Sequence, residues 1–311
     1  MILLAAPGQG AQSPGFLRPW LDLPGVAERL AWWSAVTGLD LVRYGTEADA
    51  EEIRDTAVAQ PLLVSSALLA YEQLFDVVPG AEAPARPDAV AGHSVGELAA
   101  AAVAGVLSPE AALVLVRERG RAMAEAAAVT ETGMTAVLGG DAEQVLASIE
   151  RHGLTPANVN GAGQVVAAGE VSRLQAFAED PPEKARLRSL SVAGAFHTAF
   201  MAPAVATLRA LTPGAPVQDP SAALLSNRDG AVVASGREYV TRLAEQVSAP
   251  VRWDLCMATM RELGVTAIIE LPPAGTLVGL AKRELKGVEL LALKTPDDLG
   301  RARELVKAHT A

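Results

Sequence analysis

The feature that most constrains the fold is the alternation of short apolar runs with longer segments of helical periodicity. The runs Ile2–Ala6 and Ala89–Gly92 have the length and composition of buried strands. Apolar residues then recur at helical spacing over Pro24–Val36, over Ala59–Phe75 and from Val95 onward. Strands that alternate with helices in this way predict an α/β fold with a parallel sheet.

The pattern changes after a helix that is expected to begin at Ser108 and Pro109, an N-cap residue followed by proline at the first helical position. The segments that follow are expected to be strand, helix, strand, strand, helix and strand, at Met134–Leu138, Ala142–Arg151, Ala157–Asn160, Val165–Ala168, Ser172–Phe177 and Arg186–Ser191. This β-α-β-β-α-β order is typical of a ferredoxin-like unit. We therefore expect residues 129–193 to form a small subdomain inserted in a larger domain of residues 1–128 and 194–311.

The α/β alternation returns after this insert. The expected elements are a strand near Ala223–Ser226, helices at Arg237–Gln246 and Trp253–Leu263, a strand at Ala267–Leu271 and a closing helix after Pro296. Proline and glycine between the helix at Ala59–Phe75 and the strand at Ala89–Gly92 predict an exposed loop at Pro79–Pro87.

Composition limits the partners and the compartment. A formal net charge of −10 argues against nucleic acid, which needs a clustered cationic face. The apolar runs are shorter than the roughly 20 residues of a membrane helix, and Met1–Ala6 lacks the basic start of a signal peptide. The single cysteine, Cys256, fits a reducing compartment and is expected to be a buried small hydrophobe. We expect a cytoplasmic protein that binds neither nucleic acid nor membrane.

Any anionic partner must therefore meet a local basic cluster. The candidates are Arg117, Arg119 and Arg121; Lys184, Arg186 and Arg188; and Lys282, Arg283 and Lys286. For most of these residues an ordinary solvated charge is the simpler interpretation.

A candidate nucleophile lies in Gly92-His93-Ser94-Val95-Gly96, between an expected strand and an expected helix. This is the context of a nucleophile elbow. The glycines permit a tight strand-to-helix turn, and free N–H groups at the helix start stabilise negative charge near the hydroxyl of Ser94. The pattern indicates a serine that forms a covalent intermediate.

A serine nucleophile needs a base, and the chain has four histidines, His93, His152, His197 and His309. His152 and His309 are expected to be surface residues, because one precedes a helix-ending glycine and the other lies near the C-terminus. His93 is expected to point away from Ser94. His197 remains as the candidate base, although a loop histidine with no catalytic role is the simpler interpretation of that residue alone.

Helical geometry separates Arg119 from its neighbour Arg121. The residues three and four positions from Arg119 are apolar: Leu115, Val116, Ala122 and Met123. Those around Arg121 include charged residues: Arg117, Glu118, Ala124 and Glu125. Arg119 is therefore expected to point inward, where a guanidinium needs an anion. A substrate carboxylate and an internal Asp or Glu are equally good candidates for that anion.

Taken together, these motifs resemble the malonyl-CoA:acyl carrier protein transacylases of fatty-acid synthesis, especially those of actinobacteria. The resemblance covers essentially the whole chain. Its motifs are, in chain order, Pro7-Gly8-Gln9-Gly10-Ala11-Gln12, Gly92-His93-Ser94-Val95-Gly96-Glu97, Arg119-Gly120, Asn158-Val159-Asn160, Gly163-Gln164-Val165, Phe196-His197-Thr198 with Met201, Ser226-Asn227, and Gln246 ahead of Pro250-Val251.

The resemblance implies a hydrolase-like large α/β domain with a ferredoxin-like insert, and it implies roles for single residues. Ser94 would be the nucleophile, His197 its base, and Gln246 the residue whose main-chain carbonyl orients the histidine. Arg119 would hold the malonyl carboxylate. The further substrate-binding residues would be Phe196, His93 and Asn160.

The backbone N–H groups of Gln9 and Val95 would form the oxyanion hole. Gly8 and Gly10 could otherwise belong to a dinucleotide-binding loop, but Ser13 stands where that motif needs a third glycine. Bulky Phe196 and branched Val95 resemble the residues of malonyl-selective members.

The sequence departs from the family pattern at two places. Ala249 stands where asparagine is common before Pro-Val, and Pro272-Pro273-Ala274 replaces a Gly-Pro-Gly turn. Ala249 is close to Gln246 in the chain and therefore bears on the contact that orients His197.

The reaction implied by the resemblance is a two-step acyl transfer that needs no metal or other cofactor. Its partners are malonyl-CoA and acyl carrier protein, and the chain is expected to be a monomer. A serine hydrolase such as a thioesterase or lipase is the main alternative, but a buried arginine and a histidine well before the chain end favour transfer. An inactive docking module is the other alternative, and the joint presence of Ser94, His197 and Arg119 argues against it.

Overall fold

The computed structural model describes residues 1–77 and 86–309, so most of the expected loop Pro79–Pro87 lies outside the described residues. Its first sheet has five parallel strands in the order β10-β9-β1-β2-β7. They are β1 (Ile2–Ala6), β2 (Ala89–Gly92), β7 (Ala223–Leu224), β9 (Ala267–Glu270) and β10 (Glu289–Ala292). Strands β1, β2 and β9 are buried throughout, as strands covered on both faces must be.

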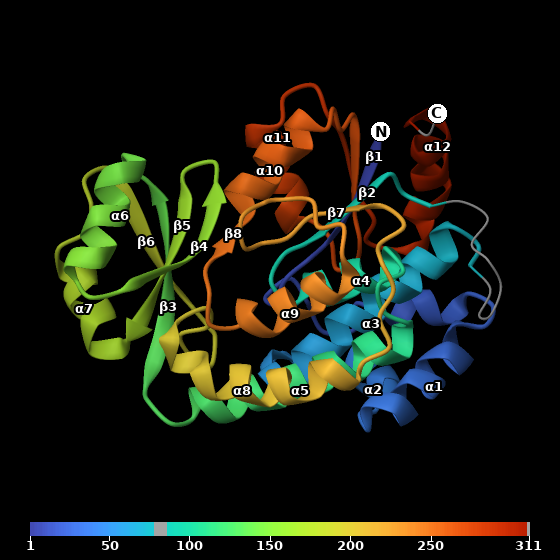
Figure 1. Ribbon diagram of the computed structural model, residues 1–311, viewed down its shortest axis with the longest axis horizontal. Coiled ribbons are helices and arrows are strands. Elements are labelled where there is room, and N and C mark those ends of the chain that lie inside the picture. The colour runs from blue at the N-terminus through green and yellow to red at the C-terminus, as the bar shows by residue number, and fades with distance from the viewer. Residues whose placement is uncertain (78–85, 310–311) are drawn as a thin grey trace.

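Helices pack around this sheet (Figure 1). They are α1 (Val26–Thr37), α2 (Leu41–Thr46), α3 (Thr56–Leu74), α4 (Gly96–Val103), α5 (Pro109–Ala127), α8 (Ala202–Leu211), α9 (Gly236–Gln246), α10 (Trp253–Glu262), α11 (Thr276–Glu284) and α12 (Leu299–His309). Short 3-10 helices occur at Arg18–Asp22, Glu52–Arg54, Ala199–Met201, Thr212–Gly214 and Pro296–Asp298. Ser108 caps α5 as expected, because its side chain accepts from the N–H of Ala111.

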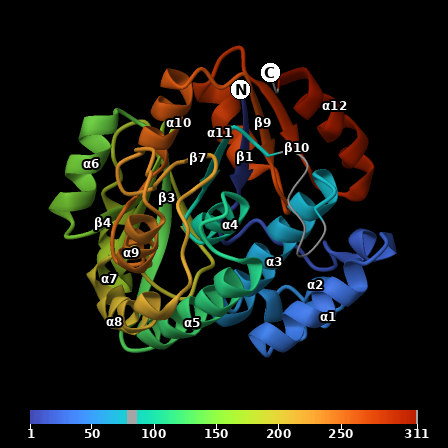
Figure 2. The same cartoon turned by 45° about the vertical axis from the view of Figure 1, so that its right-hand side comes forward.

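The second sheet has the order β6-β3-β5-β4-β8. Its elements are β3 (Thr132–Gly139), α6 (Ala142–Arg151), β4 (Thr155–Gly161), β5 (Gln164–Glu170), α7 (Val171–Glu179), β6 (Ala185–Leu190) and β8 (Val251–Arg252). The first four strands in this order pair antiparallel, whereas β8 adds to β4 in parallel. This is the ferredoxin-like arrangement predicted from the sequence, and it forms a distinct group beside the first sheet in Figures 1 and 2.

Strand β8 joins the two parts of the molecule. Its residues belong to the later part of the chain, yet Val251 pairs with Asn158 on β4, so β8 forms one edge of the second sheet. The predicted α/β fold with a ferredoxin-like insert is confirmed. The predicted boundaries of the insert, at residues 129 and 193, stay a prediction.

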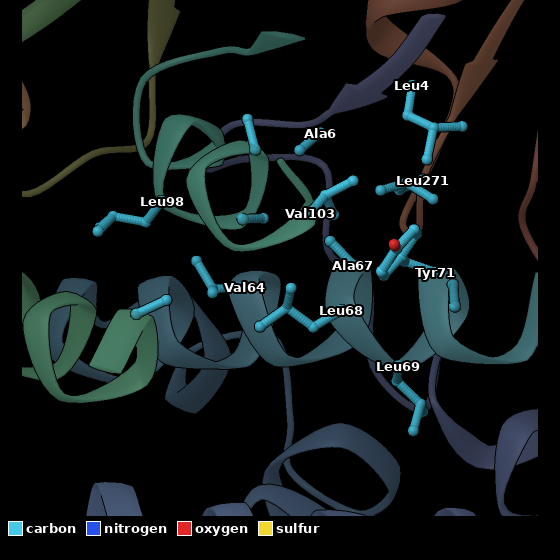
Figure 3. Packing of buried hydrophobic residues seen from close by; sticks show 14 of the residues in the cluster. Leu4, Ala6, Val64, Ala67, Leu68, Leu69, Tyr71, Leu98, Val103 and Leu271 are labelled. Atoms are coloured by element: carbon cyan, nitrogen blue, oxygen red, sulfur yellow. The ribbon is translucent and has the colours of Figure 1, made fainter. Parts of the chain in front are cut away.

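The core of the first part is built around α3, whose residues are buried on nearly every side. Val64, Ala67 and Leu68 point from α3 toward α4 in Figure 3, while Leu69 points to the opposite side. A helix with no polar face must lie in the interior. Helix α3 therefore separates α4, which begins beside the nucleophile elbow, from the outer helices α1 and α2.

Besides the short 3-10 helices, the sequence did not predict α2, β8 and β10. Strand β8 has two residues and α2 has six, which is too short for a periodic pattern to emerge.

Candidate active site

Ser94 lies in a sharp turn between β2 and α4, with a positive φ of 54°. Glycine is required on both sides of this turn. A Cβ on Gly92 would lie 2.0 Å from the backbone of Gly96, and a Cβ on Gly96 would lie 2.2 Å from the carbonyl oxygen of Ala6. A strained backbone at a reactive residue is typical of functional sites, because it fixes where the side chain points.

His197 lies in a turn between β6 and the 3-10 helix Ala199–Met201, also with a positive φ, of 61°. Its Nε2 is 2.7 Å from the Oγ of Ser94, and its Nδ1 is 2.9 Å from the carbonyl oxygen of Gln246. A carbonyl oxygen can only accept, so Nδ1 carries the proton and the lone pair of Nε2 faces the serine hydroxyl. The bond to Gln246 is present although Ala249 replaces the usual asparagine nearby.

Burial of His197, with a smaller effect from the Arg119 charge, lowers the pKa of the imidazole to about 3. The side chain is therefore neutral in the resting site and able to take a proton from Ser94. These contacts form a nucleophile, a base and an orienting acceptor in a chain of hydrogen bonds.

Arg119 points inward from α5 and is 2 % exposed, whereas the side chain of Arg121 is 51 % exposed and pairs with Glu118. The guanidinium donates to the side-chain oxygens of Gln60 and Gln246, each at 2.7 Å, and its Nη2 lies 3.3 Å from the Oγ of Ser94. Burial lowers the pKa of Arg119 to about 10, so it stays charged at neutral pH. Within residues 1–77 and 86–309, Arg119 makes no direct ion pair.

A cavity of about 250 Å³ opens beside Ser94 and His197. The other predicted site residues that line it are Gln9, His93, Val95, Asn160 and Phe196. His93 does not contact the serine hydroxyl, because its Nε2 bonds the side-chain oxygen of Asn160 at 2.9 Å. Arg119 and Gln246 lie beneath Ser94, in contact with it but outside the cavity lining. The roles assigned to these residues from the sequence stay predictions.

Three polar residues of the site were given no role in the sequence analysis. Asn227 accepts from the backbone N–H of Ser94 at 2.7 Å and donates to the carbonyl of Gly92 at the same distance, so it ties both sides of the turn together. Gln60 holds Arg119, and Glu97 contacts Gln246 and Asn227. A glutamine among the apolar residues 57–64 of α3 and a glutamate in the alanine-rich α4 are the sequence features that could have indicated Gln60 and Glu97.

His152 and His309 lie outside the site near the surface, as expected, but each is partly covered by neighbouring side chains. The ring of His152 stacks edge-on against Phe177, and only 15 % of its side chain is exposed. His309 ends α12, where its ring bonds Thr266 and Glu289. The tertiary contacts of these helix ends are invisible to local sequence patterns. Cys256 is fully buried as expected, and burial raises the pKa of its thiol.

In the part of the chain that the structure describes, no three His, Cys, Asp or Glu side chains come together as a metal site. Over the same residues, no helix has both the length and the apolar character needed to cross a membrane.

The chain is similar to known proteins over almost its whole length. The acyl transferase domain family matches residues 7–299. The malonyl CoA-acyl carrier protein transacylase of Mycobacterium tuberculosis strain H37Rv is 55 % identical over 301 residues, which is 96 % of this chain and 98 % of the relative. The counterpart from Bacillus subtilis is 32 % identical and covers 98 % of this chain and 97 % of its own.

Solved structures agree with this relationship. The crystal structure of the transacylase from Mycobacterium tuberculosis matches with a TM-score of 0.92 and 54 % identity, covering 97 % of this chain and 99 % of its own. A malonyl-transacylase solved in complex with its type II polyketide acyl-carrier protein matches with a TM-score of 0.88 and 30 % identity, covering 98 % and 99 %. The chain therefore belongs to the acyl transferase domain family and, within it, to the malonyl CoA-acyl carrier protein transacylases.

Proposed function

We propose that this protein transfers a malonyl group from coenzyme A, through an ester on Ser94, to the phosphopantetheine thiol of an acyl carrier protein. The observation that carries the proposal is the joint position of three side chains. The Oγ of Ser94 lies 2.7 Å from Nε2 of His197 and 3.3 Å from Nη2 of Arg119. A base and a cation therefore meet at one hydroxyl, which fits an acyl group that carries its own carboxylate.

In the first step, the Ser94 hydroxyl attacks the thioester carbonyl while its proton passes to Nε2 of His197. The carbonyl of Gln246 accepts from Nδ1 and stabilises the imidazolium that forms. The coenzyme A sulfur then leaves and takes the proton from His197. In the second step, the carrier-protein thiol gives its proton to His197 and attacks the ester, and Ser94 recovers its hydrogen.

We assign stabilisation of the oxyanion in each tetrahedral intermediate to the backbone N–H groups of Gln9 and Val95. Val95 directly precedes α4, and its backbone N–H donates to no group among the described residues, whereas the N–H groups of Gly96 and Glu97 do. Gln9 lines the same cavity. We assign binding of the malonyl carboxylate to Arg119. Phe196 lines the cavity beside His197 and is assigned to exclusion of a larger acyl group.

The acyl acceptor is proposed by analogy with the relatives, whose names specify acyl carrier protein. Malonyl groups on such a carrier supply fatty-acid synthesis, and the relative solved with its polyketide carrier makes polyketide synthesis the second candidate pathway. The protein is proposed to act in the cytoplasm as a monomer.

Intact-mass measurement after mixing with malonyl-CoA tests the proposal. Wild-type protein is expected to gain one malonyl group, and Ser94→Ala is expected to gain none while keeping the wild-type unfolding transition. Wild-type protein that stays unmodified would contradict acyl transfer through Ser94.

Adding carrier protein distinguishes a transferase from a serine hydrolase. For a transferase, the malonyl-enzyme persists in buffer and disappears when holo acyl carrier protein is added, and the mass appears on the carrier. A malonyl-enzyme that decays to free malonate at the same rate with or without carrier would identify a hydrolase.

A further inference from the structure

Glu97 is a buried carboxylate directly below the nucleophile, and the reaction steps above do not use it. It lies in the first turn of α4 and is 2 % exposed. Its Oε2 accepts from the side-chain Nε2 of Gln246 at 2.6 Å, and its Oε1 accepts from the backbone N–H of Asn227 at 2.6 Å. The hydroxyl of Tyr239 lies 3.4 Å from Oε1. Both oxygens thus face donors, the arrangement that suits an ionised carboxylate.

The side-chain amide of Gln246 has only one orientation that satisfies its neighbours. Its Oε1 accepts from Nη2 of Arg119, and its Nε2 donates to Glu97 and, at 3.0 Å, to the carbonyl oxygen of Ser94. A flipped amide would place a donor against the guanidinium and an acceptor against two acceptors. Arg119 and Glu97 therefore fix the amide from opposite sides, and the main-chain carbonyl of the same residue orients His197.

Glu97 also provides a negative charge for Arg119 without touching it. The two ions are separated by the amide of Gln246, and their attraction acts on both. A direct ion pair would occupy the guanidinium donors that a substrate carboxylate needs. Separation by one amide leaves the guanidinium unpaired with any carboxylate of the described residues and still offsets part of the cost of burying the arginine.

We propose that Glu97 is a positioning residue for acyl transfer, because its carboxylate holds Gln246 in the orientation that serves both His197 and Arg119. The same carboxylate connects to the nucleophile by a second route. Asn227, whose N–H it binds, accepts from the backbone N–H of Ser94. This inference rests on the proposed acyl transfer and adds a residue that sets the geometry of that site.

The charge of Glu97 is expected to change within the working pH range. Burial raises the pKa of Glu97 to about 7, and the bonds from Asn227 and Gln246 and the Arg119 charge limit that rise. The charged and titratable groups around it are Arg119 from α5, Tyr239, Arg242 and Glu245 from α9, Arg228 ahead of α9, and Cys256 from α10. Glu97 lines a second cavity of about 140 Å³ with Arg228 and Arg242, apart from the substrate cavity, through which its proton can exchange.

The sign of the effect follows from the hydrogen bonds. Protonation would turn one oxygen of Glu97 into a donor facing an N–H donor of Gln246 or Asn227 and so weaken that contact. Activity is therefore expected to be full above the pKa of Glu97 and to fall as pH decreases through about 7. His197 cannot cause that loss, because its pKa of about 3 keeps it neutral there.

Glu97→Gln tests the proposal, with Glu72→Gln as the matched control. Glu72 is also a buried glutamate, but it pairs with Arg29 on α1 and lies outside the site. Acylation by a malonyl thioester of N-acetylcysteamine, which has no titrating phosphate, is measured over a range of pH and expressed per acylatable serine. This normalisation removes any loss of folded protein, and wild-type acylation in the same assay tests the proposed function separately.

For Glu97→Gln, we expect kcat per site to fall about tenfold to a hundredfold, the effect of losing one hydrogen bond to a charged group, without an increase in KM. The wild-type rate is expected to decrease as pH falls near 7, and this decrease is expected to be absent in Glu97→Gln. The Glu97→Asp variant keeps the charge and is expected to show the same decrease as wild type. Glu72→Gln is expected to lower the unfolding midpoint only.

A Glu97→Gln variant with wild-type kcat per site and a wild-type pH profile would overturn the proposal. If that variant does not fold, the wild-type profile decides. A rate that stays constant as pH falls through about 7 would show that the ionisation of Glu97 does not control the site.

Discussion

Replacing Arg119 by alanine removes the cation that we assign to the malonyl carboxylate. Arg119 is almost fully buried, so water cannot replace a missing partner, and its Nη2 lies 3.3 Å from the nucleophilic oxygen. An acetyl group has no carboxylate and leaves the guanidinium with its neutral contacts to Gln60, Gln246 and Ser94. Selectivity for malonyl over acetyl is therefore expected to depend on this side chain.

The size of the effect follows from the burial of the pair. Truncating one partner of a buried charge pair costs about 2–5 kcal/mol. Gln60 and Gln246 already accept hydrogen bonds from the guanidinium. The free-energy cost of leaving it without a carboxylate partner is therefore expected at the lower end of this range. At about 1.4 kcal/mol for each factor of ten, malonyl is expected to be preferred over acetyl by a factor on the order of 10².

Competition between malonyl-CoA and acetyl-CoA measures this ratio directly as the masses of the two acyl-enzymes. Arg119→Ala is expected to lower malonyl transfer by the same factor of about 10² and to remove or invert the preference. Arg121→Ala is the matched control, because Arg121 is on the same helix but points to solvent. A malonyl-over-acetyl ratio that survives in Arg119→Ala would refute the reasoning and leave Arg119 as a structural cation.

Three further predictions concern the base, the acyl pocket and the carrier surface. His197→Ala is expected to slow acylation by about 10²–10⁴-fold, as single-turnover mass measurements would show, whereas an unchanged rate would indicate another base. Phe196→Ser is expected to relax the exclusion of methylmalonyl-CoA by about tenfold in the competition assay, and an unchanged ratio would exclude Phe196 as the steric barrier. The double variant Lys282→Glu and Arg283→Glu is expected to raise KM for carrier protein and to leave acylation by malonyl-CoA unchanged, and Lys307→Glu is the control. Equal effects on both half-reactions would contradict carrier docking at Lys282 and Arg283.

The carrier prediction has a structural basis in α11. Leu277 and Leu280 on this helix line the substrate cavity, while Lys282 and Arg283 in its last turn are exposed. An acidic carrier bound at these cations would place its phosphopantetheine arm close to the cavity. A local basic patch can direct such a partner even though the whole chain is acidic.

The sequence predicted those features that depend on local patterns. Strand β1, strand β2 and the turn at Ser94 follow from apolar runs and glycine spacing, and the inward direction of Arg119 follows from helical periodicity. The antiparallel strand order of the insert was predictable because the β-α-β-β-α-β sequence of elements has a preferred topology.

Long-range polar contacts could not be predicted in this way. Gln60 and Arg119 are 59 positions apart, and Glu97 and Gln246 are 149 apart, so no local period connects them. Strand β8 is defined by its pairing with β4, which is distant in the sequence. A two-residue strand of this kind is determined by its partner rather than by its own residues.

The position of Arg119 links recognition of the substrate to the strength of the base. Its charge is one cause of the lowered pKa of His197, after burial. A malonyl carboxylate that pairs with Arg119 offsets this charge, so His197 becomes a stronger base when the correct acyl group is bound. A neutral carbonyl of Gln246 behind the histidine suits this arrangement, because a carboxylate there would add a negative charge near the malonyl group. It follows that Arg119→Ala strengthens the base as well as removing the anion site, so acetyl transfer is expected to rise in that variant while malonyl transfer falls.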